Sequence, residues 1–456
     1  MARILPPEII REIYGYIYAP MRLHKLNDFP WHLGQICASW RSIFHSMVSN
    51  FWNRLDIDLN AIYKYGDSEL VVHRYDVMLL ALRYFLDHTK GQPFSFQFEA
   101  RKRCPAEEDE RMIRLFELLV AESFRWREIN IRLVSSLLPM LYKAKHHMTL
   151  LSSAQLIGVS YVANPQHIHD LFEDVPHLTR LELGPFPNWR VNWASLSVLK
   201  LTRGYEYDDE LLSILGQAKN LEKLAIYESP EDAPYLDETT SPISFPNLKV
   251  LSITIVDAEL LPLLQTPSLE ELYIKGLDEF EELDRSRNKV ISFLTGSSCQ
   301  LRCLGIAGCG ADFLTDILRC TPDLLHLNLG QDNCKDMLDY FNQLAFHHHG
   351  IPPLACHLRS LMVIDPGFSF MEIMELAVLL ASRTERVEDS SGIAPVEKLQ
   401  KLMIITSFKG ELVQYNNRTA VQTLRQQCAE HGVEFTVQHA CDIPLSYYDN
   451  TSILDW

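Results

Sequence analysis

The sequence lacks several features that would each have pointed to a class of protein. It has no apolar run of about 18 residues, so it predicts no transmembrane helix and no membrane partner. It has no excess of basic residues: 59 acidic against 42 basic side chains give a net charge of −17. That balance argues against nucleic acid as a partner, because phosphate binding depends on clustered Lys and Arg. Pro6, Pro7 and Glu8 stand where a secretory signal would have an unbroken apolar core.

Cysteine usage agrees with a chain that stays inside the cell. The ten cysteines are scattered without close pairs, and a chain of this size needs no disulfide framework. We therefore expect free thiols and a cytoplasmic or nuclear location.

Signatures of catalysis are also missing from the sequence. The glycine-rich stretch 305–310 lacks the Lys-Ser/Thr of a phosphate-binding loop, and neither G-x-S-x-G nor H-E-x-x-H occurs. The run His347-His348-His349 has no Cys or carboxylate at ligand spacing, so we interpret it as a solvated loop and predict no metal. A Cys–His nucleophile stays open, since such partners meet only in the fold. We expect no cofactor and a non-catalytic protein.

What the sequence does contain is a repeated pattern. The motif L-x-x-L-x-L, with Ile or Val allowed at its last position, recurs nine times. Its three apolar positions are Leu178-Leu181-Leu183, Leu196-Leu199-Leu201, Leu221-Leu224-Ile226, Leu248-Leu251-Ile253, Leu269-Leu272-Ile274, Leu301-Leu304-Ile306, Leu324-Leu327-Leu329, Leu358-Leu361-Val363 and Leu399-Leu402-Ile404. Eight steps cover the 221 residues from Leu181 to Leu402, or about 28 residues per step. That period is typical of leucine-rich repeats, each with one short strand and one helix.

Further signals support a repeat array. Several units open with proline, at 176, 246, 267 and 322, which would end one element and set up the turn into the strand. Cys309 occupies the ninth place of its repeat, where a buried side chain would bond the backbone of the turn. Weaker copies at 126–131 and 151–156 bring the expected total to eleven or twelve. An ordinary βα domain with parallel strands is the alternative.

The predicted array is flanked by other elements. We expect helices over 71–88, 105–119 and 419–431, and strands over 94–98 and 433–437, with Gly432 ending the last helix in the left-handed conformation. Three segments should form loops on the rim: 228–242, 277–288 and 346–353. The tail 441–456 is predicted to cover the open end, because a solenoid's terminal repeats must be capped.

The first sixty residues read differently, as short amphipathic helices. Ile9, Ile10, Ile13 and Ile17 form one apolar stripe at helical spacing, after a proline suited to a first turn. A second helical stripe is predicted from Leu33 through Trp40, and the segment closes on 51–55. About fifty residues cannot bury such faces on each other alone. The segment is therefore either a cap on the repeats or a docking module for a partner.

These residues resemble an F-box, in particular the divergent F-boxes of fungal proteins. The matching features are L-P-x-E-I…I at 5–13, L-x-x-I-C-x-x-W-R at 33–41, and W-x-x-L at 52–55. The sequence departs from the family in having Ile36 before the cysteine, where Val is usual, and a longer link over 19–30. The match covers about 50 residues.

The resemblance implies binding to the Skp-type adaptor of a cullin-RING ubiquitin ligase, and through that adaptor to a cullin. The expected adaptor contacts, some of which would instead pack internally, are Leu5, Pro6, Ile9, Ile13, Leu33, Ile36, Cys37, Trp40 and Trp52.

We expect an α/β fold: a short helical F-box domain (1–60), a connecting region with the first solenoid turns (61–125), an irregular leucine-rich-repeat solenoid (126–440) and a tail (441–456). Strands should line the concave side and helices the outside. Residues that alternate with the leucines would face the concave side, where the third, fifth and seventh places of the nine repeats hold five basic and two acidic side chains.

This basic surface predicts an acidic or phosphorylated protein target, with chance placement on a solvated sheet as the alternative. The candidate target-binding residues are Arg180, Lys200, Lys223, Tyr227, Tyr273, Lys275, His326 and Asn328. The sequence thus favours the substrate-recognition subunit of an SCF-type ubiquitin ligase. A non-catalytic repeat scaffold unrelated to ubiquitin transfer is the competing hypothesis.

Overall fold

The structure is a computed structural model, and it describes residues 5–16, 20–29, 31–47, 52–63, 68–89, 91–100, 106–132, 134–157, 169–184, 189–202, 208–227, 242–276, 283–297, 299–330, 354–364, 376, 379, 397–406 and 419–439. The chain forms two compact units, Met1–Glu210 and Leu211–Trp456. Both are of the α/β type with parallel strands. None of the helices in these described ranges is both long and apolar enough to cross a membrane.

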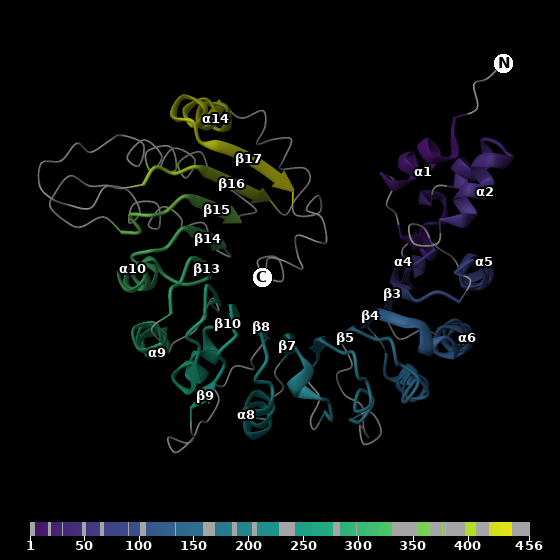
Figure 1. The fold of residues 1–456 in the computed structure, drawn as a ribbon, viewed down its shortest axis with the longest axis horizontal. Coiled ribbons are helices and arrows are strands. Elements are labelled where there is room, and N and C mark those ends of the chain that lie inside the picture. Colours follow the sequence, from purple (N-terminus) through teal and green to yellow (C-terminus); the bar gives the residue numbers. More distant parts are fainter. Residues whose placement is uncertain are drawn as a thin grey trace, which may run out of the picture. The chain divides into compact units, whose positions relative to one another are not determined.

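Unit 1 contains strands that pair in chain order, each parallel to the one before it. They are β1 (Met21–Arg22), β2 (Arg54–Asp58), β3 (Phe94–Glu99), β4 (Trp126–Arg132), β5 (Ser153–Ile157), β6 (Arg180–Leu183) and β7 (Val198–Thr202). The connecting helices are α4 (Asn60–Tyr63), α5 (Ser68–His88), α6 (Ala106–Ala121) and α7 (Leu138–Tyr142), with short 3₁₀ turns η3 (Ser123–Arg125), η4 (Ser135–Leu137) and η5 (Trp193–Ser195). Helices α5 and α6 lie along one side of β3 and β4 (Figure 1).

The N-terminal helices flank the first strand in sequence, with α1 before β1 and the others after it. They are α1 (Pro7–Gly15), η1 (Leu23–Asp28), η2 (Trp31–Gln35) and α2 (Ala38–Ser46). The prediction of one continuous helical stripe from Leu33 through Trp40 was wrong. Leu33 lies in the 3₁₀ helix η2, the backbone at Cys37 is extended (φ −162°, ψ 175°), and α2 begins only at Ala38. The extended residue breaks the helical repeat, so the two halves of the motif lie on different elements.

Unit 2 repeats the arrangement of parallel strands and connecting helices. Its main sheet contains β8 (Lys223–Tyr227), β10 (Val250–Thr254), β12 (Glu271–Lys275), β13 (Cys303–Ala307), β14 (His326–Gly330), β15 (Ser360–Ile364), β16 (Lys401–Thr406) and β17 (Glu434–His439). Two short strands, β9 (Ile243–Ser244) and β11 (Leu264–Gln265), pair separately. The helices are α8 (Asp208–Gln217, which begins at the end of unit 1), η6 (Val256–Leu263), α9 (Leu283–Gly296), α10 (Ala311–Cys320) and α14 (Thr419–His431). Helices α9 and α10 lie on one side of β10 and β13 (Figure 1).

Each of the nine predicted leucine motifs contains a strand, from β6 to β16. The motif leucines are buried, as in β12, where Leu272 and Ile274 are both 0% exposed. Four strands are entered through a turn with proline at its second position, as predicted. In these turns the amide of the motif's first leucine donates to the carbonyl three residues earlier, over 3.4 Å at Leu178, 3.3 Å at Leu248, 3.1 Å at Leu269 and 3.3 Å at Leu324. Proline suits that position because its φ is already set.

Two local predictions about single residues are confirmed. Cys309 is buried, and its sulfur donates to the carbonyl oxygen of Ala307 at 3.5 Å, which closes the turn after β13. Gly432 has φ +68° and ends α14 immediately before β17. Glycine adopts this conformation without a Cβ penalty.

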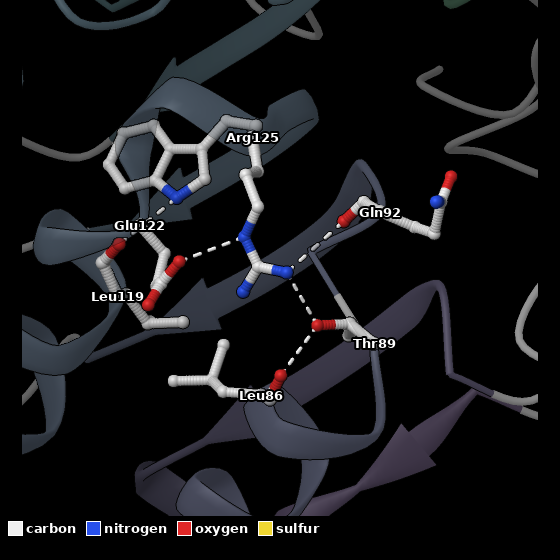
Figure 2. Close-up of polar contacts among 7 residues, drawn as sticks. Leu86, Thr89, Gln92, Leu119, Glu122 and Arg125 are labelled. Carbon is white, nitrogen blue, oxygen red and sulfur yellow. Dashed lines mark hydrogen bonds and ion pairs between the residues drawn. The ribbon is translucent and has the colours of Figure 1, made fainter.

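The segment 61–125, predicted to hold the first solenoid turns, contains β3 with α5 before it and α6 after it in sequence. A buried arginine joins these two helices' ends. Arg125 is 4% exposed; it donates through Nη1 to Thr89 Oγ1 at 2.6 Å and to the carbonyl of Gln92 at 3.3 Å, and through Nε to Glu122 at 2.8 Å (Figure 2). The same guanidinium lies 5.3 Å from the ring centroid of Phe94. Successive turns of unit 1 are thus held together by one charged side chain.

The strands β1 and β2 were not predicted. Leu55, expected to close the F-box helices, is instead a core residue of β2 and pairs with Met21 of β1. The link at 19–30, which sets this sequence apart from the usual F-box spacing, therefore supplies the first strand of the unit 1 sheet. Of the three predicted rim loops, 346–353 lies outside the described residues, as do most of 228–242 and the first half of 277–288. The prediction was wrong for the second half of 277–288, because α9 begins at Leu283. The tail 441–456 also lies outside the described residues.

Candidate protein-binding surfaces

An apolar patch lies on the N-terminal helices. We define it by seven of the predicted adaptor contacts, which are exposed or half-buried: Leu5, Pro6, Ile9, Ile13, Ile36, Cys37 and Trp40. The exposed fractions of Leu5, Ile9 and Ile36 are 40%, 42% and 55%, which is high for large apolar side chains. Seven of the nine predicted adaptor contacts are thus at least partly accessible.

Tyr14 holds the two halves of the patch together. Its ring is fully buried, and its hydroxyl lies 3.3 Å from the carbonyl of Leu33 and 3.2 Å from that of Trp40. The rings of Tyr14 and Trp40 meet edge to face with centroids 5.4 Å apart. Burial, followed by the nearby Cys37 thiol, raises the pKa of Tyr14 to about 12. The contact docks α1 on α2, so that the exposed residues of both elements belong to one module.

Two of the predicted adaptor contacts are not at the surface. Leu33 is 6% exposed and Trp52 is 0% exposed. Trp52 lies in an aromatic cluster, with centroid distances of 5.3 Å to Phe29, 5.7 Å to Phe44 and 4.7 Å to His88. Because α5 contributes His88, this cluster packs the N-terminal helices against the first sheet unit. Trp52 therefore fixes the module in place and does not present its side chain to a partner.

A second surface lies on the unit 1 sheet. Residues that alternate with the buried core side chains are all half-buried or exposed, and most are polar. We call this the polar face; its members are Arg22, Arg54, Asp56, Asp58, Ser95, Gln97, Glu99, Glu128, Asn130, Arg132, Ser153, Gln155, Ile157, Arg180, Glu182, Val198, Lys200 and Thr202. Its middle row runs in register across seven strands, through Arg22, Asp56, Gln97, Asn130, Gln155, Glu182 and Lys200.

Acidic and basic residues are balanced on the polar face, five of each. At its N-terminal edge, burial raises the pKa of Asp56; His24 and Arg22 oppose the shift, and Asp58 and Glu99 add to it. Arg22 lies 3.6 Å from the Asp56 carboxylate. The residues predicted to line the concave side begin at β6 and so do not include those on β1 to β5. Strict alternation in the segments 94–98 and 126–131 was the signal that could have found them.

The predicted target-binding residues are divided between the units. Arg180 and Lys200 lie on the polar face, where Lys200 forms an ion pair with Glu182 at 3.9 Å. In unit 2, Lys223, Tyr227 and Lys275 are half-buried and His326 is exposed.

Two of the predicted target anchors are inside the protein. Tyr273 is 1% exposed; its hydroxyl donates to Glu271 at 2.8 Å and lies 3.4 Å from the Cys303 sulfur. Asn328 is 7% exposed and donates to the same sulfur at 3.3 Å. These side chains belong to a buried cluster on the face that the sequence predicted to be open, with Val250, Cys303, Met362, Met403 and Ile405. Neither Tyr273 nor Asn328 is available there to anchor a target.

The described ranges contain no group of three or more His, Cys, Asp or Glu residues placed to hold a metal ion. The histidine run at 347–349 lies outside those ranges. No family model matches the chain, and no curated protein matches it either.

Proposed function

We propose that the chain is a substrate-recognition subunit of an SCF-type cullin-RING ubiquitin ligase, with an F-box at 1–60 and leucine-rich repeats after it. The observation that carries the proposal is the apolar patch: a small helical module with an internal aromatic core still exposes Leu5, Ile9 and Ile36. Large apolar side chains gathered on one module mark an interaction surface. Their positions are those at which the F-box motif implies contact with a Skp-type adaptor.

The repeats would then hold a target protein. Ubiquitin transfer would be accelerated by proximity, since confining two reactants converts an encounter into an effectively unimolecular step. The chain itself contributes no reacting group in this proposal. Cullin binding would follow through the adaptor.

The test is capture of a purified Skp-type adaptor by the full chain. The double variant Ile9→Ser, Ile36→Ser should lose at least about 100-fold in affinity, because central apolar anchors carry most of an interface's energy. Both side chains are exposed in the free chain, so the variant should fold. The matched control is Leu80→Ser with Leu150→Ser, two equally exposed apolar residues of unit 1 that lie outside the patch, at 65% and 43%.

A repeat scaffold unrelated to ubiquitin transfer is the second candidate. It is favoured by the polar face, whose exposed and half-buried polar side chains could contact a protein without any adaptor. Failure of the wild-type chain to bind the adaptor, under conditions in which it is folded, would select the scaffold.

A further inference from the structure

The middle row of the polar face has charged residues at both ends and uncharged residues at its centre. Across the middle row, Arg22 and Asp56 stand at one end and Glu182 and Lys200 at the other. Between them, β3, β4 and β5 contribute three primary amides in register: Gln97, Asn130 and Gln155. We call these three residues the amide row.

The acidic residues of the polar face already have partners. Asp56 is paired with Arg22, Glu128 with Arg54 at 3.7 Å, and Glu182 with Lys200. Asp58 accepts from the backbone amides of Asn60 and Ala61 at 2.9 and 3.2 Å, where it caps α4. Glu99 accepts from the Asn60 side chain at 3.2 Å. Their capacity to bind a further group is thus largely used within the protein.

The amide row and two arginines of the polar face lack such partners among the described residues. Within the described residues, none of the three amide side chains forms a hydrogen bond, and neither Arg132 nor Arg180 forms an ion pair. Asn130 Oδ1 and Arg132 Nε are buried atoms without a partner. Buried polar groups in folded proteins are nearly always hydrogen-bonded, so a cluster of exceptions calls for an explanation. Arg132 and Arg180 lie on opposite sides of the amide row, on β4 and β6.

We propose that the amide row binds the main chain of an extended segment of the target protein, and that Arg132 and Arg180 bind acidic groups on that segment. This inference rests on the proposed function for the identity of the partner as a target. A primary amide offers both a donor and an acceptor, as a peptide group does. Neighbouring strands are about 4.8 Å apart, so three amides span about 10 Å, or roughly three residues of extended chain.

The guanidinium groups of Arg132 and Arg180 determine which chemical groups the bound segment should carry. Arginine binds carboxylate and phosphate through two parallel hydrogen bonds. The shared chemistry is an anionic oxygen group, supplied either by Asp or Glu or by a phosphorylated side chain. The site lies on unit 1, whereas Lys223, Tyr273 and Lys275, which the sequence had suggested, belong to unit 2.

The experiment measures binding of fluorescent heptapeptide pools to the full chain. Each of the three pools has one fixed central residue, which is Glu, phosphoserine or Gln. The flanking positions carry a random mixture of amino acids. We expect the Glu or the phosphoserine pool to bind at least about tenfold more tightly than the Gln pool, and the stronger of the two identifies the source of the anion. Arg132→Met with Arg180→Met should remove this preference, and Asn130→Ala should weaken every pool.

Arg54→Met is the matched control, because Arg54 lies on the same face but is already paired with Glu128. It should keep the preference for the anionic pools. Equal binding of the three pools, no binding of any, or a preference that survives Arg132→Met with Arg180→Met would overturn the inference. Adaptor capture by the same variants is measured separately. If the wild-type chain does not bind the adaptor but prefers the anionic peptides, the proposed function is contradicted and the inference about the polar face stands. If it binds the adaptor but shows no preference among the peptides, the inference is overturned and the proposed function stands.

Discussion

The ring of Tyr273 lies directly against Gly305, its register partner on the neighbouring strand. A Cβ at position 305 would lie 2.3 Å from Cδ1 of Tyr273, closer than real atoms approach. The ring has nowhere to move, because it is 1% exposed and its hydroxyl is bonded to Glu271. Glycine at 305 is therefore a packing requirement of the buried cluster in unit 2.

Gly305→Ala should lower the free energy of unfolding by about 2 kcal/mol, in the range measured for overpacked cores. Urea denaturation followed by circular dichroism would measure it. The control is Gly216→Ala in α8, where a Cβ would meet no atom within 4 Å. That change should be neutral or stabilise by up to about 1 kcal/mol, since alanine is the better helix former. Equal stability of the two variants would contradict the packing described for Tyr273.

Arg125→Ala should destabilise unit 1 by about 3 kcal/mol. The substitution removes a buried charge that joins Thr89, Gln92 and Glu122, and breaking such a network costs more than the same change at the surface. Thermal unfolding would measure the loss. Arg319→Ala is the comparison: its ion pair with Asp316 at 3.2 Å is made by a side chain that is 65% exposed, and it should cost less than about 1 kcal/mol.

Stability of the N-terminal helices should fall at alkaline pH. The pKa of Tyr14 is raised to about 12 in the folded chain, above the ordinary value near 10. A raised pKa means that the folded state favours the protonated hydroxyl, so its contribution is complete below about pH 10 and is lost as the pH rises toward 12. Tyr14→Phe should reduce this loss over that interval. Unfolding curves at pH 9 to 12, with tyrosinate absorbance alongside, would test it, and identical pH profiles for the two proteins would refute it.

Thiol labelling should separate the cysteines and report on the patch. Cys37 is exposed, whereas burial raises the pKa of Cys303 to about 12 and that of Cys428 to about 11. At neutral pH a maleimide should therefore modify Cys37 rapidly and the two buried thiols slowly, because the thiolate is the reactive form. Addition of a Skp-type adaptor should protect Cys37. The adaptor should not protect Cys37 in the double variant Ile9→Ser with Ile36→Ser. If the adaptor does not slow the labelling of Cys37 in the wild type, the result would count against the proposed interface.

Local sequence predicted the strands of this fold well, for a physical reason. Motif leucines such as Leu272 and Leu304 must be buried whatever surrounds them, and their spacing alone defines a strand and its core face. The other face could not be predicted in the same way. Tyr273 in unit 2 and Asn130 in unit 1 occupy equivalent alternate positions, yet one is buried and the other half-exposed. What covers a sheet face depends on packing between distant parts of the chain, which no short pattern records.

The candidate patch shows the same limit. Seven of the nine predicted adaptor contacts are at least partly exposed, but Leu33 and Trp52 are core residues. An apolar side chain in a recognition motif can either pack in the core of its own module or contact a partner. Its spacing in the sequence therefore could not show that Trp40 is partly exposed and Trp52 is buried. Strand β1 was missed because two residues are too few to show any alternation.

Strand β1 has a mechanical consequence. Met21–Arg22 lies between α1 and α2 in sequence and pairs in parallel with β2, so a piece of the N-terminal segment is itself part of the unit 1 sheet. A flexible tether would let a captured protein sample many orientations. Here the N-terminal helices and the first strands belong to one compact unit, so a partner on the helices and a partner on the sheet would bind the same unit.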